Sequence, residues 1–125
     1  MKIRLQYALI CDDVRREDNG KLILIGVYGR HVGYSALPVV ASFSLVVSIL
    51  TDGVGEEVIE FRCIADGIEK YANKGMLNID APGAATFNVP MLNLELDNKT
   101  VLEFQWKLPD TDKWEEIFSI PVVPD

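Results

Sequence analysis

The sequence is poor in the residues on which most enzyme active sites depend. It has one histidine, His31, and two cysteines, and it contains no G-x-S-x-G, P-loop, H-E-x-x-H or C-x-x-C motif. A Ser-His or Cys-His pair would have to use His31, which follows Arg30 in a glycine-rich loop that we expect to be exposed. We therefore predict a surface histidine without a role, no catalytic residues, no cofactor, and a protein that is not an enzyme.

Long apolar segments are also missing. No run approaches the roughly 18 apolar residues of a membrane-spanning helix. The basic start and the apolar residues 7–11 resemble a signal peptide only superficially. That stretch is shorter than the about 7–15 residues such a region needs, and Asp12 and Asp13 follow it without a cleavage site. We expect a mature first strand, no membrane association and a cytoplasmic protein.

Positive charge is scarce. Twelve Lys and Arg against nineteen Asp and Glu give a net charge of −7 and a sequence pI of about 4.6. Such a surface repels phosphate backbones and anionic lipids, and the Arg15-Arg16 pair is flanked by acids on both sides. We predict that neither nucleic acid nor a membrane is a partner.

The two cysteines, Cys11 and Cys63, lie 52 positions apart, which is compatible with an immunoglobulin-type disulfide. However, Trp106 and Trp114 both follow Cys63 instead of lying between the cysteines. We favour two buried free thiols, as expected in a reducing compartment.

What is abundant is the two-residue period of β-strands. Phe43, Leu45, Val47 and Ile49 alternate with polar residues that include Ser42, Ser44 and Ser48. Leu102, Phe104, Trp106 and Leu108 alternate in the same way, and so do Leu92, Leu94 and Leu96. The pattern predicts a single domain, 1–125, that is all-β: an antiparallel two-sheet β-sandwich, immunoglobulin-like or C2-like, of seven or eight strands. The expected strands are 3–14, 21–29, 41–50, 56–65, 70–79, 86–96, 100–108 and 114–122.

Turn residues separate these strands. Asn19-Gly20, Asp52-Gly53, Asp66-Gly67 and Asp97-Asn98 lie between apolar runs, as hairpin turns require. One alternative is a short helix over 66–75, because Asp66 and Glu69 have capping-box spacing. The inward positions change from odd to even after Val89, which predicts a bulge near Pro90.

The runs YALIC and LILIGVY, at 7–11 and 22–28, are apolar on both faces. This is typical of covered, central strands. LILIGVY and SLVVSIL carry more apolar surface than one small core absorbs, so either a second layer or another subunit covers them.

Carboxylates provide the one candidate for a metal site. In some β-sandwiches, such as C2 domains, aspartates from several loops at one end bind calcium. The candidates here are Asp12, Asp13, Asp18 and Asp66. The alternative is that aspartate simply caps turns, and that Arg15 and Arg16 pair with neighbouring acids.

Two segments resemble an uncharacterised bacterial family of small proteins. YALICDDVRREDNGKLILIGVYG, residues 7–29, has an apolar strand ending in acid, a Gly-Lys turn, and a second apolar strand closing on I-G-V-Y. VPMLNLELDNKTV resembles the family's second landmark, a strand–turn–strand near the C-terminus. The resemblance covers about half the chain. It implies a β-sandwich and assigns no activity and no site residues.

Three functional hypotheses follow. The first is a non-enzymatic protein that binds another protein or its own copy, and so forms a homo-oligomer in the second case. The second is a module that binds calcium or a small ligand through aspartate-rich end loops. The third is an enzyme with a carboxylate pair in one cleft.

Overall fold

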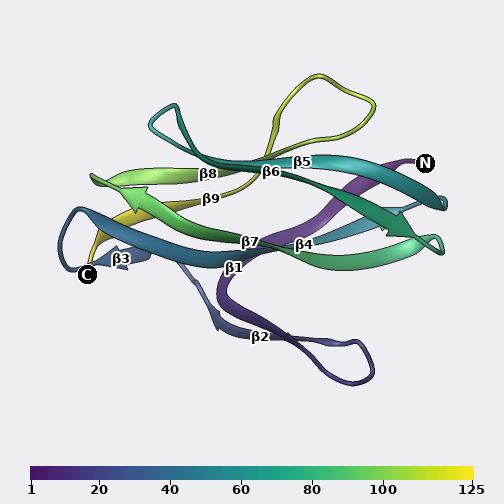
Figure 1. Ribbon diagram of the computed structural model, residues 1–125, viewed down its shortest axis with the longest axis horizontal. Coiled ribbons are helices and arrows are strands. Elements are labelled where there is room, and N and C mark those ends of the chain that lie inside the picture. The colour runs from purple at the N-terminus through teal and green to yellow at the C-terminus, as the bar shows by residue number, and fades with distance from the viewer.

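Nine β-strands and no helix form the computed structural model, which describes residues 1–125 (Figure 1). Because no helix is present, none is long and apolar enough to cross a membrane. One strand more is present than the sequence predicted. The strands are β1 (Ile3–Arg16), β2 (Leu22–Val27), β3 (Val32–Tyr34), β4 (Val39–Thr51), β5 (Gly55–Ala65), β6 (Ile68–Ile79), β7 (Gly83–Leu96), β8 (Thr100–Lys107) and β9 (Glu115–Pro124).

The strands form two sheets. One has the order β2-β1-β4-β7 and the other the order β3-β9-β8-β5-β6. Every pairing is antiparallel except that of β3 with β9, which is parallel, so the prediction of purely antiparallel sheets is wrong at this one point. β3 is the additional strand. It was missed because it has three residues and lies in a glycine-rich stretch that gives no periodicity.

The core is built from one face of each sheet. Leu102, Phe104 and Trp106 of β8 are buried and alternate with exposed or half-buried residues, which confirms the alternation predicted there. Phe43, Leu45, Val47 and Ile49 of β4 are buried as predicted, but the residues between them, Ser44, Val46 and Ser48, are buried too, so both faces of this strand are covered. Two ring contacts join the sheets. The ring centres of Phe43 on β4 and Phe104 on β8 are 5.7 Å apart, and those of Phe61 on β5 and Phe87 on β7 are 5.8 Å apart.

The bulge in β7 lies two or three residues beyond the predicted place. Phe43 of β4 is opposite Met91, and Ala41 is opposite Leu94, so β7 carries one extra residue between these pairs. Asn93 adopts a positive φ of 60° there. Phe87, Val89 and Met91 therefore precede the phase change, which begins at Leu94. Leu92 was expected in the core but is 61% exposed.

The region 66–75 forms no helix. Asp66 and Gly67 make a two-residue turn between β5 and β6, and both have positive φ, 52° and 73°. That backbone is typical of a type I′ hairpin turn, which matches the right-handed twist of the flanking strands. The capping-box spacing was misleading because the tertiary pairing of β6 with β5 outweighs a short local helix signal.

Replacement of Asp66 by alanine should lower the free energy of unfolding by about 2 kcal/mol. The Asp66 carboxylate accepts hydrogen bonds from Thr100 Oγ1 at 2.8 Å and from Asn98 Nδ2 at 3.0 Å, which join two turns. Alanine cannot accept either hydrogen bond, and it tolerates the positive φ of this position less well than aspartate does. Urea titration measures the change. Asp66→Gly is the control, since it loses only the hydrogen bonds; a loss equal to that of alanine would refute the backbone contribution.

Both cysteines are free and buried, as predicted. Cys63 lies in the core between the sheets, and burial raises the pKa of its thiol to about 12. Burial likewise raises the pKa of Cys11. Neither thiol is poised as a nucleophile, because only the thiolate attacks.

Candidate functional site

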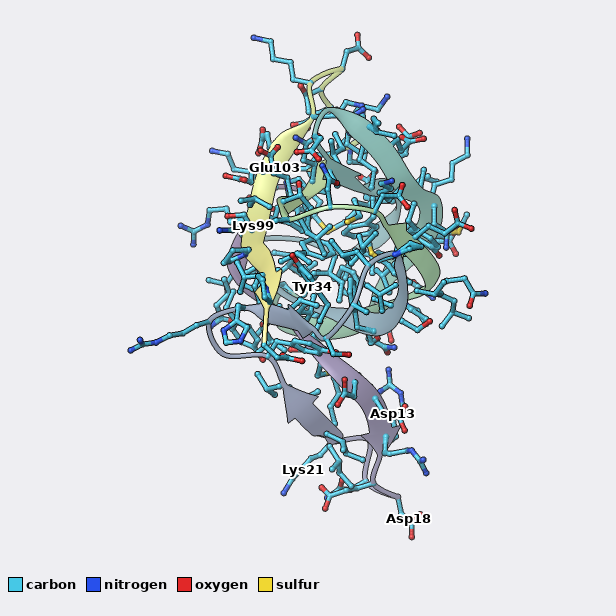
Figure 2. All side chains as sticks on the ribbon, turned by 90° about the vertical axis from the view of Figure 1, so that its left-hand side faces the viewer. Asp13, Asp18, Lys21, Tyr34, Lys99 and Glu103 are labelled. Carbon is cyan, nitrogen blue, oxygen red and sulfur yellow. The ribbon has the colours of Figure 1, made fainter.

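The end of the first hairpin projects from the body of the protein as an arm, residues 12–27 (Figures 1 and 2). β1 pairs with β4 only as far as Cys11, and beyond this point it pairs with β2 alone. The tip turns as the Asn19-Gly20 pair predicted. Gly20 has φ 88°, its N–H donates to the Glu17 carbonyl at 2.9 Å, and the Lys21 N–H donates to Asn19 Oδ1 at 3.1 Å.

β2 is an edge strand, not a central one. Its single neighbour is β1, so one row of its backbone N–H and C=O groups has no strand partner. The sequence could not reveal this, because a strand that is apolar on both faces can be either covered by other strands or left bare. The prediction that LILIGVY is a central strand is therefore wrong, whereas β1 does lie between two strands.

One face of β2 carries a bare apolar stripe. Ile23, Ile25 and Val27 are 43%, 46% and 51% exposed, and they alternate with the half-buried Leu22 and Leu24. Because alternate residues of a strand share a face, these three side chains form one continuous row. We call this row the apolar stripe. No other strand exposes three large apolar side chains in succession on one face.

The opposite side of the arm borders a groove of about 490 Å³. Its apolar lining comes from Leu22 and Leu24 of the arm and from Tyr7 and Val46 of the sheet. Leu22 and Leu24 therefore face the groove, on the side of the arm opposite the apolar stripe. The remaining lining residues are Arg16, Gly20, Lys21 and Thr86. No pattern in the sequence indicates this groove, since its walls come from segments far apart in the chain.

The base of the arm is held by Tyr28. Its ring packs edge-on against Phe43 of the core, with centroids 6.1 Å apart, and its backbone N–H donates to the Ile10 carbonyl at 3.0 Å. Burial, and after it the neighbouring Asp12 carboxylate, raise the pKa of Tyr28 to about 12. Asp12 lies over Gly26, whose φ of 69° and missing side chain make room for the carboxylate.

The predicted metal candidates do not come together. Asp13 and Asp18 lie at separate places along the arm, Asp18 at its far end (Figure 2), whereas Asp66 lies in the β5–β6 turn with its two hydrogen bonds. Arg15 Nε donates a hydrogen bond to Asp13 Oδ2 at 2.6 Å, and this bond lowers the pKa of the Asp13 carboxyl. No three His, Cys, Asp or Glu side chains in the structure are grouped as metal ligands.

Several polar and charged side chains on the outer face of the second sheet interact with one another. Lys107 pairs with Glu60 at 2.9 Å, Arg62 donates to Gln105 at 2.8 Å, and the Arg62 guanidinium lies 4.1 Å from the ring centre of Trp114. His31 is exposed in the loop after β2, as expected. Other large apolar side chains are exposed singly or as a pair, such as Val58 opposite Met76, whereas the arm carries three in one row.

The family comparison matches almost the whole chain. The model of a family of unknown function, DUF6941, matches residues 6–120. The chain belongs to this family. This agrees with the resemblance to an uncharacterised family found in the sequence. The match includes the complete arm and all of β2–β8. A search of curated proteins finds no match to this sequence.

Proposed function

We propose that this DUF6941 protein is not an enzyme and acts by binding a protein through its arm. The observation that carries the proposal is the apolar stripe on an edge strand with no second neighbour. An extended segment added to such an edge gains backbone hydrogen bonds, and alternate side chains supply apolar contact. β2 offers both an unpaired backbone edge and a row of exposed apolar side chains.

The other three edge strands support this choice of surface, because each has a feature that opposes further pairing. β7 contains Pro90, β6 carries Lys70 and Lys74, and β3 has only three residues. β2 has six residues, LILIGV, with neither charge nor proline, and its one irregular backbone position is Gly26, near its end, with a φ of 69°. An unprotected apolar edge invites aggregation unless a partner covers it.

The scaffold in this proposal is a β-sandwich of immunoglobulin-like or C2-like type. The two cross-sheet ring contacts and a core drawn from both sheets support two layers packed face to face. A rigid body of this kind would hold the arm at a fixed angle. The two free, buried thiols favour a reducing compartment, and we propose the cytoplasm.

A photo-cross-linking amino acid placed at residue 25 in living cells tests the proposal. Ile25 is the centre of the apolar stripe, and we expect irradiation to give adducts larger by the mass of a protein. The matched control is residue 101, since Val101 is 48% exposed but lies on β8, inside the other sheet. Adducts at residue 101 equal to those at residue 25, or none at either position, would refute the arm as the binding surface.

A further inference from the structure

We propose that the arm's partner is a second copy of this chain, with β2 of one protomer antiparallel to β2 of the other. The two-fold axis passes beside Ile25. The inference rests on the proposed function and names its partner. Pairing would join the two four-stranded sheets into one continuous sheet and leave neither β2 as an edge.

The apolar stripe is self-complementary in this register. An axis at Ile25 places that side chain opposite its own copy, and it places Ile23 of each protomer opposite Val27 of the other. Directly opposite residues on one face of an antiparallel pair lie with their Cβ atoms about 4.5–5.5 Å apart. All three exposed side chains thus meet apolar side chains, and each contact is repeated by the symmetry of an isologous interface.

Charges of both signs lie at the two ends of the strand. The tip of the arm carries Glu17 and Asp18 together with Arg16 and Lys21, and the segment after β2 carries Arg30; all five residues are exposed. An antiparallel arrangement brings the two acids at the tip of one arm alongside the Arg30 segment of the other, at both ends of the interface. A parallel arrangement would instead place Asp18 beside its own copy, which is repulsive.

These charged groups are free for such contacts. The two ion pairs in the structure are Asp13–Arg15 and Glu60–Lys107, so neither Glu17, Asp18 nor Arg30 is engaged within the chain. The arm's projection from the body leaves space for a second arm beside it (Figure 2). Leu22 and Leu24 line the groove, so the pairing leaves them in place and uses the side chains that the fold leaves exposed.

Light scattering on a sizing column gives the first part of the test. The purified protein should have twice the mass of the 14.0-kDa chain. Ile25→Lys should be a monomer, because it places two like charges at the axis, while Val101→Lys should remain a dimer. Ile25 is half exposed, so its replacement should leave the fold and its circular dichroism unchanged.

Cross-linking with a short bis-maleimide tests the register. Ile25→Cys should cross-link to itself. Ile23→Cys and Val27→Cys should cross-link when mixed, and each alone should do so at least tenfold less. The native thiols do not interfere, because Cys11 and Cys63 are buried. Cross-links of Ile23→Cys with itself, equal to those in the mixture, would overturn the antiparallel register.

A strict monomer at high concentration would overturn self-association, and an Ile25→Lys protein that stays dimeric would overturn β2 as the interface. The first result would leave the proposed function testable, since adducts at residue 25 in cells would then contain a different protein. A monomer that also gives no adducts at residue 25 in cells would refute both proposals.

Discussion

Replacement of Phe104 by alanine is expected to lower the free energy of unfolding by about 3–5 kcal/mol, which is a large part of the stability of a small domain. Phe104 is fully buried on β8. Its ring lies 5.7 Å from Phe43 of the opposite sheet and 5.8 Å from Phe118 of the neighbouring strand. Alanine would leave a cavity at the point where the two sheets meet, and it would remove both ring contacts. Urea denaturation followed by tryptophan fluorescence measures the loss.

Phe118→Ala is the matched control for this core position. Phe118 is half-buried and contacts Phe104 within the same sheet. Its replacement by alanine should therefore lower the free energy of unfolding by less than half as much. If the two variants were equally stable, the account of Phe104 as the residue that joins the sheets would be wrong.

Alkaline pH should destabilise the protein through Cys63. Burial raises the pKa of this thiol from 9.0 to about 12. Above pH 9 the unfolded chain loses the thiol proton while the folded protein retains it, so stability is complete below pH 9 and falls as the pH rises toward 12. A shift of this size corresponds to about 4 kcal/mol by pH 12, of which about 2–3 kcal/mol is lost by pH 11.

Cys63→Ala isolates this contribution. The variant should be less stable than the native protein at pH 8, because a buried sulfur is lost, and its stability should fall less steeply between pH 9 and pH 11. Urea midpoints at several pH values, with a reductant present, give the difference. Tyr28, whose pKa is also about 12, adds a fall in stability with rising pH that is the same in both proteins. Parallel curves for the two proteins would contradict the assignment to Cys63.

Much of the fold could be predicted from local pattern. The strand ranges follow the two-residue alternation closely, as in β8, which was expected over 100–108 and spans Thr100–Lys107. The turns at Asn19-Gly20 and Asp66-Gly67 were also predicted correctly, because positive φ restricts these positions to a few residue types.

Features that depend on distant parts of the chain could not be predicted. The three residues of β3 acquire their strand conformation from parallel pairing with β9, which lies about ninety residues later. The bulge in β7 was expected near Pro90 because the inward positions change from odd to even after Val89. The chain instead places the extra residue at Leu92-Asn93, where asparagine tolerates a positive φ.

The candidate site illustrates the same limit. The segment LILIGVY was identified as carrying too much apolar surface for one core, and this excess is confirmed by the exposure of Ile23, Ile25 and Val27. Its position at the edge of a sheet depends on the order of four strands, which alternation does not encode. The charged residues 12–18, which first suggested a metal site, form the arm that presents this strand.

Photo-cross-linking at residue 25 in living cells tests the central claim most directly, because it asks whether a protein covers the apolar stripe where the chain functions. We expect protein adducts from residue 25 and none from residue 101. Equal adducts from both positions, or no adduct from residue 25, would contradict it.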